Sequence, residues 1–162
     1  MALLPPTPLS ADDDLGSFDC GNALLNDWLR ELALKSEGRS AQTYVVKDRR
    51  RVVGYYCLAT GGVAREGMPR KIRHGLPSLV PVMILGRLAV DLGCQGQGIG
   101  CGLLKDALQR VLQVAREVGV RALLVHAIDD AAQAFYTGHG FIELPARSRT
   151  LFLPVETIAR GL

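Results

Sequence analysis

The segment Arg87–Leu104, RLAVDLGCQGQGIGCGLL, contains an unusual density of glycine between two regular patterns. An apolar, strand-like run leads into four glycines at alternate positions, Gly96, Gly98, Gly100 and Gly102, and a long helical pattern follows. The first turn of a helix presents unpaired backbone N–H groups and the positive end of the helix dipole, and glycine lets a ligand approach the backbone closely. A strand, a glycine turn and a helix in this order therefore predict an anion site, most often for phosphate.

Three phosphate-binding patterns compete for this turn. The P-loop needs lysine and then serine or threonine directly after its last glycine, whereas Cys101 follows Gly100 and the next lysine is Lys105. The dinucleotide fingerprint G-x-G-x-x-G fails from every glycine at which it could start. The third pattern is Gln or Arg, two residues, Gly, one residue, and Gly or Ala. Six successive residues satisfy it: Gln95, Gly96, Gln97, Gly98, Ile99 and Gly100.

A second motif follows a predicted strand further along the chain. The segment Asp129–Phe141, DDAAQAFYTGHGF, matches the pattern N-x-x-A-x-x-x-Y-x-x-x-G-F except at its first position, where aspartate replaces asparagine. The glycine turn and this motif, in this order and at this separation, resemble the GNAT family of N-acetyltransferases. The resemblance runs from about Phe18 to Pro154, almost the whole chain. The matching positions of the second motif are Asp129, Ala132, Tyr136, Gly140 and Phe141.

The resemblance implies acetyl-CoA as the cofactor, with its pyrophosphate on the glycine turn. In GNAT proteins the strand before the turn pairs its backbone with the pantetheine arm, and the matching residues here are Leu88, Ala89 and Val90. Cofactor contacts are also implied at Asp129, Ala132 and Phe135, although the exchange at the first of these leaves its own contact open. The resemblance gives Tyr136 the task of protonating the departing thiolate. From the residues alone, the alternative is an aromatic packed against the sheet with its hydroxyl in water.

Length predicts a single domain, residues 1–162. The order of helical and strand patterns predicts an α/β or α+β fold with one central mixed sheet, and the GNAT resemblance implies that this sheet is mostly antiparallel and flanked by helices. The C-terminal stretch 150–162 is expected to form an edge strand and a short tail, which serve a dimer interface or close the sheet. Helices are predicted over 22–36, 98–118 and 129–139, strands over 42–47, 51–60, 81–92, 121–128, 140–144 and 150–155, and a long loop over 61–79.

The segments around the two motifs resemble the TacT and AtaT type of GNAT toxin; they are residues 18–29, 52–65, 81–91 and 122–141. This resemblance implies acetylation of the α-amino group of aminoacyl-tRNA, which blocks translation, a ribbon-helix-helix antitoxin as partner, and a homodimer. A free α-amine titrates near 7.7–8.0 and lysine near 10.4, so such a substrate needs little help from a general base. Four residues are available as a base, and none stands out: Glu66, His74, Asp91 and His126.

Positive charge is concentrated in the middle of the chain. Residues 39–74 carry nine basic side chains against two acidic ones, whereas residues 1–38 carry two against seven, including the run Asp12–Asp14, which is expected to be a solvated loop. Such clustering is typical of a polyanion-binding surface, and the alternative is a solvated hairpin tip and a solvated loop. Arg87 has its own alternative, a structural pairing with an acid such as Asp91. The candidate tRNA-binding residues are Arg49, Arg50, Arg51, Arg65, Arg70, Lys71, Arg73 and Arg87.

Composition narrows the remaining classes of function. No apolar run reaches the roughly 18 residues of a spanning helix, and the N-terminal stretch MALLPPTPLS lacks the features of a signal peptide, so a cytoplasmic protein is expected. The four cysteines form neither a C-x-x-C pair nor a metal pattern with histidine, which predicts unpaired thiols and no metal site. Two rival functions stay open: a GNAT enzyme that acts on a small amine or a protein amine, and a non-catalytic CoA-binding interaction module.

Overall fold

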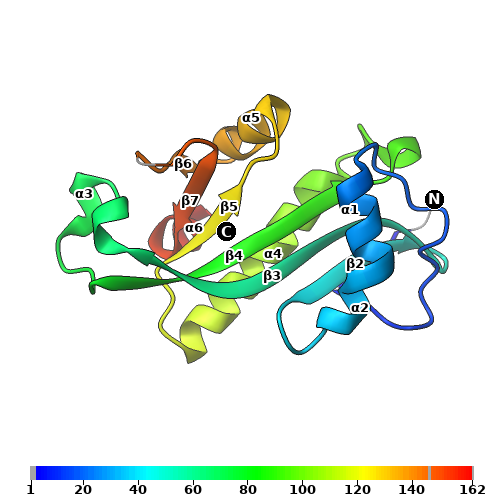
Figure 1. Ribbon diagram of the computed structural model, residues 1–162, viewed down its shortest axis with the longest axis horizontal. Coiled ribbons are helices and arrows are strands. Elements are labelled where there is room, and N and C mark those ends of the chain that lie inside the picture. Colours follow the sequence, from blue (N-terminus) through cyan, green and yellow to red (C-terminus); the bar gives the residue numbers. More distant parts are fainter. Residues whose placement is uncertain (1–2, 146, 162) are drawn as a thin grey trace. The chain divides into compact units, whose positions relative to one another are not determined.

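The computed structural model describes residues 3–145 and 147–161 (Figure 1). The chain forms two compact units from segments that alternate along the sequence. The first unit contains the chain up to Ala59 together with Gly86–Ala107, and the second contains Thr60–Leu85 together with the chain from Leu108 onward. Two long strands, β3 (Arg51–Ala64) and β4 (Leu79–Val90), each begin in one unit and end in the other.

Seven strands form one sheet in the order β1-β2-β3-β4-β5-β7-β6. The pair β4–β5 is parallel, whereas the pairs β1–β2, β2–β3, β5–β7 and β6–β7 are antiparallel. The expectation of a mixed, mostly antiparallel sheet flanked by helices is confirmed. The bounds of the other strands are β1 (Thr7–Pro8), β2 (Gln42–Asp48), β5 (Ala122–His126), β6 (Ile142–Glu143) and β7 (Thr150–Pro154).

In the first unit a helix covers one face of the β2–β3 hairpin, and it lies in front of these strands in Figure 1. Asn22 begins this helix, because its side-chain oxygen accepts a hydrogen bond from the Leu25 N–H at 3.2 Å. The helix has three parts, α1 (Ala23–Asp27), the π-helical turn η1 (Trp28–Leu32) and α2 (Ala33–Ser36). The helix predicted over 22–36 is therefore confirmed, with a π turn that the sequence pattern did not indicate.

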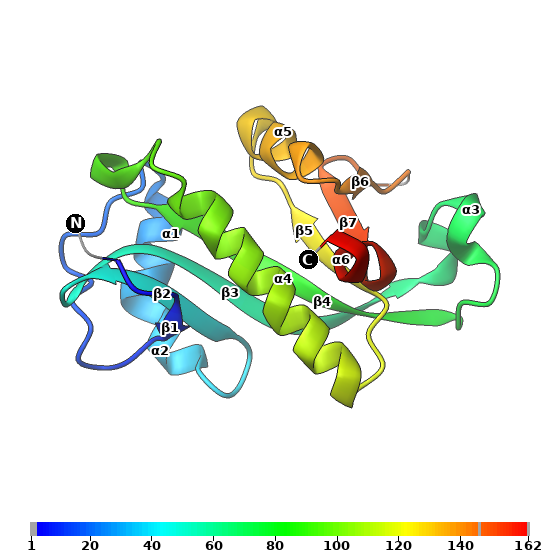
Figure 2. The same ribbon diagram turned by 180° about the vertical axis from the view of Figure 1, so that it is seen from behind.

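The two faces of strand β3 pack against different helices, as the alternation of side chains along a strand requires. Tyr55 is fully buried in the core beneath Trp28. On the other face, Tyr56 donates a hydrogen bond to Asp106 of helix α4 (Ile99–Glu117), which lies in front of the sheet in Figure 2. Gly54 makes room for this helix, because a Cβ there would lie 3.1 Å from both Ile99 Cγ2 and Leu103 Cδ1.

In the second unit, β5 pairs with β4 over Val82–Leu85 and with β7 along its whole length. A core of Val63, Met68, Val80, Leu124 and Phe152, among others, packs in this unit. The connection between β3 and β4 forms two short helical turns, η2 (Arg65–Gly67) and α3 (Arg70–Arg73). The helices that follow are α5 (Asp130–Gly138) and α6 (Val155–Gly161).

Two sequence-based expectations about elements are wrong. The stretch 61–64, predicted as the start of a loop, continues strand β3. Its glycines suggested a turn, but Gly61 provides close packing instead, because a Cβ there would lie 2.5 Å from Ile84 Cδ1. The C-terminal segment was predicted as an edge strand with a tail. Strand β7 lies inside the sheet, between β5 and the short edge strand β6, and the tail forms α6 around the buried Ile158.

Candidate acetyl-CoA and acceptor site

The strand before the glycine turn leaves its parallel neighbour before it reaches the turn. Within the described residues, the ladder between β4 and β5 ends at the pair Leu85↔Val125. Leu88, Ala89 and Val90 follow in β4, beyond that last pair. Ala89 is buried and the other two are half-buried. The three residues thus lie on a stretch of strand whose backbone is not paired with β5, which suits a ligand that binds as an extended chain.

The glycine turn has a backbone that only glycine adopts readily. Gly96 and Gly98 have φ of 78° and 83°, in the left-handed region, and a Cβ at either position would meet open space. Helical bonding in α4 begins with the Gly102 N–H, which donates to the Gly98 carbonyl at 3.0 Å. The N–H groups of Ile99, Gly100 and Cys101 therefore precede the first helical bond and stand at the positive end of the helix dipole.

Two polar side chains hold this turn against the end of β4. The buried Asp91 accepts hydrogen bonds from the Gly93 N–H at 3.0 Å and from the Asp19 N–H at 2.9 Å. Gln95 donates from Nε2 to the Val90 carbonyl at 3.0 Å. Asp91, one of the residues considered as a general base, thus has both carboxylate oxygens engaged by the backbone. The exposed stretch Gln95–Gly98 is fixed at its base while its outer surface stays accessible.

The second motif forms a compact cluster around helix α5 in the second unit. Asp129 caps the helix, because its Oδ1 accepts from the Ala132 N–H at 2.8 Å. The ring of Tyr136 is buried and packs edge-to-face against Phe135 at 5.2 Å and Phe141 at 5.4 Å between centroids. The predicted motif residues are therefore brought together, and the tyrosine ring is held in one orientation by its neighbours.

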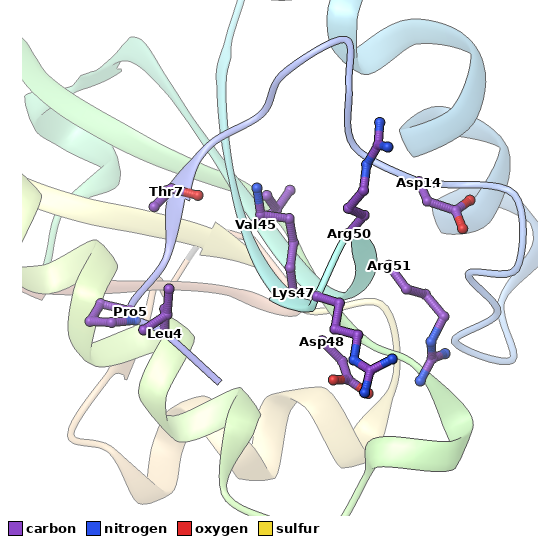
Figure 3. A pocket seen from close by; sticks show the side chains of 10 residues that line it. Leu4, Pro5, Thr7, Asp14, Val45, Lys47, Asp48, Arg50 and Arg51 are labelled. Atoms are coloured by element: carbon purple, nitrogen blue, oxygen red, sulfur yellow. The ribbon is translucent and has the colours of Figure 1, made fainter. Parts of the chain in front are cut away.

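The basic tip of the β2–β3 hairpin borders a pocket of about 880 Å³ in the first unit. Figure 3 shows Leu4, Pro5 and Thr7 of the N-terminal segment on one side of this pocket and the hairpin residues on the other. Arg49 lies at the tip with φ of 60°, in the left-handed region. The basic and acidic residues that line the pocket are Lys47, Arg49, Arg50, Arg51, Asp14 and Asp48.

The acidic run near the N-terminus is not simply a solvated loop, as was expected from the sequence. Lys47 Nζ lies 2.8 Å from Asp13 Oδ1, and that carboxylate is almost completely buried. Arg50 donates to the Asp12 carbonyl at 3.1 Å. The run therefore binds the hairpin and neutralises part of its charge, a pairing between residues too distant in sequence for the pattern to indicate.

The second basic cluster lies in the connection between β3 and β4. Some of its side chains bond to the local backbone, and others are exposed. Arg73 donates from Nε to the Met68 carbonyl at 2.6 Å and from Nη2 to the Glu66 carbonyl at 2.8 Å. Arg65 donates to the Leu76 carbonyl at 3.1 Å. These two arginines stabilise the local backbone, whereas Arg70 and Lys71 are exposed on α3.

Arg87 does not pair with Asp91, which was its structural alternative. The cation beside Asp91 is Arg51, at 3.8 Å. The guanidinium of Arg87 instead lies over the ring of Trp28, with its Cζ 4.3 Å from the ring centroid. No sequence pattern indicated this contact, because the two residues come from distant segments of the chain.

Two classes of feature are not found among the described residues. No group of three or more His, Cys, Asp or Glu side chains there is arranged to hold a metal ion. None of the helices in the described part of the chain is both long enough and apolar enough to span a membrane. The four cysteines are free thiols: Cys57 and Cys94 are buried, Cys20 is half-buried and Cys101 is exposed.

Comparison with known proteins identifies a family and several curated relatives. The model of the acetyltransferase (GNAT) domain matches residues 39–143. The chain is 44% identical over 158 residues to a "tRNA-acetylating toxin" of Mycobacterium tuberculosis, an alignment that covers 97% of this chain and 95% of the relative. It is 26% identical over 157 residues to a "Probable toxin TacT" of Sinorhizobium fredii, with 90% and 87% covered.

Solved structures of similar proteins superpose over almost the whole chain. A mutant of KacT matches with a TM-score of 0.92 at 31% identity, with all of both chains covered. AtaT complexed with acetyl-methionyl-tRNAfMet matches with a TM-score of 0.91 at 31% identity, with 99% of each chain covered. AtaTR bound with AcCoA matches with a TM-score of 0.85 at 33% identity, with 98% of this chain and 97% of that chain covered.

Proposed function

The chain belongs to the GNAT acetyltransferase family, and we propose that it acetylates the α-amino group of aminoacyl-tRNA and so blocks translation. It is an N-acetyltransferase that uses acetyl-CoA. The observation that carries the choice of substrate is its 44% identity, over 97% of the chain, to a tRNA-acetylating toxin. The similarity in fold to AtaT in complex with acetyl-methionyl-tRNAfMet supports the same choice.

The residues of the first unit fit a bound pyrophosphate. The backbone N–H groups at the start of α4 follow a turn in which a Cβ at Gly96 or Gly98 would meet open space, as an anion site at a helix N-terminus requires. Side chains at these two positions would be strained and would stand in that space. The predicted cofactor stretches Leu88–Val90 and Gln95–Gly100 therefore remain our assignment for the pantetheine and pyrophosphate portions.

The bound cofactor supplies an acetyl group activated as a thioester. We assign to Tyr136 Oη the delivery of a proton to the departing sulfur, as the second motif implies. The packing of its ring supports this assignment, because a proton donor must be held in a fixed direction to act in the transition state. The substrate α-amine titrates near neutral pH and reacts as the free base, so no general base is assigned.

The basic residues form our proposed tRNA-binding surfaces, one on each unit. On the hairpin tip, Arg49 and Arg50 are exposed and line the pocket described above. On α3, Arg70 and Lys71 are exposed. A tRNA acceptor stem presents a dense line of phosphates, and binding of basic side chains releases its counterions. Three other predicted residues, Arg51, Arg65 and Arg73, are half-buried and have local partners, and we assign them a supporting role.

The proposed partners follow from the same relatives. Solved structures of AtaT include complexes with the antitoxin AtaR. We propose that this chain is likewise inhibited by an antitoxin, of the ribbon-helix-helix class, and that it acts as a homodimer in the cytoplasm. A neighbouring reading frame that encodes a small ribbon-helix-helix protein would support the first point.

Cell-free translation tests the proposal directly. Purified protein is added with and without acetyl-CoA, and the aminoacyl-tRNA pool is then analysed by mass spectrometry. Arrest that requires acetyl-CoA, together with N-acetylated aminoacyl-tRNA, is the expected result, and it also identifies the amino acid. Normal translation and unmodified tRNA, from protein that still binds acetyl-CoA, would refute the tRNA substrate and favour a small amine or a protein amine.

A further inference from the structure

A rigid aromatic platform lies beneath the α1–η1 helix in the first unit. Trp28 is buried, and its ring stacks on Tyr55 with 6.0 Å between centroids and 13° between planes. Tyr55 is in turn fixed by an edge contact with Phe18 at 5.6 Å and by a hydrogen bond from its hydroxyl to the Leu25 carbonyl at 2.7 Å. Trp28 is also the first residue of the π-helical turn, and such turns are frequent at functional sites.

Arg87 carries a charge on this platform without an acidic partner. Its guanidinium lies 4.3 Å over the Trp28 ring, and the side chain is half-buried. No carboxylate forms an ion pair with it among residues 3–145 and 147–161. The nearby acids have other partners, because Asp91 pairs with Arg51, and Asp19 accepts from the Gly21 N–H and from Asn26.

Two titratable side chains that interact with Arg87, Cys57 and Tyr55, favour their neutral forms and supply no counter-charge. Burial raises the pKa of the Cys57 thiol, and the adjacent guanidinium lowers it by a smaller amount. Burial also raises the pKa of the Tyr55 hydroxyl well above its ordinary value. The face of the Trp28 ring attracts the positive charge of the guanidinium. It does not accept hydrogen bonds from the five N–H groups at the edge of the guanidinium plane. The site is therefore positively charged. The guanidinium forms a hydrogen bond with the Cys57 thiol, but no carboxylate in the described part of the chain neutralises it.

Arg87 lies next to the stretch of strand proposed to bind the acetyl donor, where the acceptor substrate must also approach. Arg87 directly precedes Leu88, the first residue of the proposed pantetheine strand, and lies beyond the last β4–β5 pair. Side chains alternate along a strand, so Arg87 shares its face with Ala89, which packs in the same core cluster as Trp28. The guanidinium is thus on the helix-covered face of β4, beside the residues that would hold the acetyl donor.

We propose that Arg87, held by Trp28, binds the phosphodiester next to the terminal nucleoside of the acceptor substrate. A guanidinium edge matches two phosphate oxygens, and this bidentate pairing fixes orientation as well as adding binding energy. The carboxyl group of an aminoacyl ester is uncharged, so the anion nearest to the reacting amine is this phosphodiester. The inference rests on the proposed function, and it assigns the residue that positions the end of the nucleic acid.

A fluorescence titration tests the site without any acetylation. Trp28 is the sole tryptophan of the chain, so its emission reports on the guanidinium above it. The trinucleotide CpCpA should change this emission in a saturable way, whereas adenosine, which lacks phosphate, should not. Arg87→Gln should abolish the change. A response to adenosine equal to that of CpCpA, or an unchanged response in Arg87→Gln, would overturn the proposal.

Kinetics separate a binding role from a purely structural one. Arg87→Gln should raise the KM for aminoacyl-tRNA about ten- to a hundredfold, the range for a lost charge-assisted hydrogen bond, while the KM for acetyl-CoA stays unchanged. Arg39→Gln is the matched control, because Arg39 is exposed and the change in net charge is the same. A lower melting temperature with an unchanged KM for tRNA would show that Arg87 only packs against Trp28.

The conservative variant protects the test against a failure to fold. Arg87→Lys keeps a cation over the ring but loses the planar fork, so the protein should fold, with a KM for tRNA between those of the wild type and Arg87→Gln. If both Arg87→Lys and Arg87→Gln had the wild-type KM for aminoacyl-tRNA, the inference would be wrong. The absence of any acetylated tRNA from wild-type enzyme is a different result, because it refutes the proposed function and leaves the CpCpA titration as the test of the site.

Discussion

Tyr136, the proposed proton donor, has a ring whose position is set by its packing. Phe135 and Phe141 hold its ring on two sides, and its backbone carbonyl accepts from the Phe141 N–H at 3.1 Å. Removal of the hydroxyl leaves this packing intact. We therefore expect Tyr136→Phe to lower the rate of acetyl transfer about 10²–10⁴-fold, the usual effect of a lost proton donor. Thiol release in the steady state measures the rate, and the melting temperature and acetyl-CoA affinity should stay close to those of the wild type.

Tyr136→Ala serves as the comparison for that variant, because it removes the ring as well and should destabilise the core. Near-wild-type turnover in Tyr136→Phe would end the assignment of the hydroxyl as the proton donor. A rate loss that merely parallels a loss of stability in both variants would instead assign the residue to packing.

Asp129 departs from the asparagine expected in the family, and the structure explains why the exchange is tolerated. Its Oδ1 caps α5 by accepting from the Ala132 N–H, a bond that the asparagine oxygen also makes. Asp129→Asn should therefore change the free energy of unfolding very little, whereas Asp129→Ala should lower it by about 0.5–2 kcal/mol. Urea unfolding measures both. Equal losses in the two variants would contradict the capping role.

The conformation of the glycine turn was predictable from the sequence, because the left-handed φ of Gly96 and Gly98 is a local property. The partners of Arg65 and Arg73 were not, since both arginines bind backbone carbonyls whose positions depend on the fold. The same holds for the contact of Arg87 with Trp28, which joins two distant segments. Charge patterns therefore predicted where basic residues gather, but not which of them are already engaged.

The N-terminal turn of α4 has a natural reporter in Cys101. This thiol is exposed and lies in the first turn, next to the N–H groups proposed to bind pyrophosphate. We expect acetyl-CoA to slow its alkylation by iodoacetamide in proportion to the fraction of protein bound. Peptide mass spectrometry measures the rate, with Cys20, which is half-buried and has a pKa raised by burial, as the internal comparison. A rate at Cys101 that is indifferent to saturating acetyl-CoA would place the cofactor elsewhere.

The four residues of helix α3 include two exposed basic side chains, proposed to bind tRNA, and one arginine that bonds to the local backbone. Reversal of the exposed pair with Arg70→Glu and Lys71→Glu should weaken acetylation of aminoacyl-tRNA while the melting temperature stays unchanged. The slope of log affinity against log salt should flatten by about 0.7–0.9 for each lost phosphate contact. Arg73→Glu is the contrasting variant, because it breaks bonds to two carbonyls and should cost stability. An unchanged salt slope in the double variant would exclude α3 from the tRNA surface.

At the level of elements, the longer helices were predicted best because their apolar periodicity is local, whereas the short helix α6 was predicted as a tail. Helix α4 was placed within about one residue of each end. The strands were harder, because the extent of β3 and the interior place of β7 depend on pairing with segments elsewhere in the chain. The glycines at 61 and 62 illustrate the difficulty, since the same residue type marks a turn in one context and close packing in another.

For the whole molecule, the prediction of a single domain stays a prediction, and unfolding can test it. Strands β3 and β4 are each divided between the two compact units. Neither unit is therefore a continuous stretch of chain with complete strands of its own. We expect one cooperative transition. Emission from Trp28, in the first unit, and far-ultraviolet circular dichroism, from all helices, should give coincident curves in urea. Two separated transitions would show that the units unfold independently.

The alternation of the two units along the chain also bears on how the protein is made. The first unit needs Gly86–Ala107, so the strands that precede Ala59 leave the ribosome before their remaining partners exist. Domains tend to fold as units during synthesis, from the N-terminus onward. The glycine turn emerges late in this order, and Tyr136 later still. A nascent chain therefore lacks both proposed site segments until most of its own polypeptide has been synthesised, and acetyl transfer can begin only after that point.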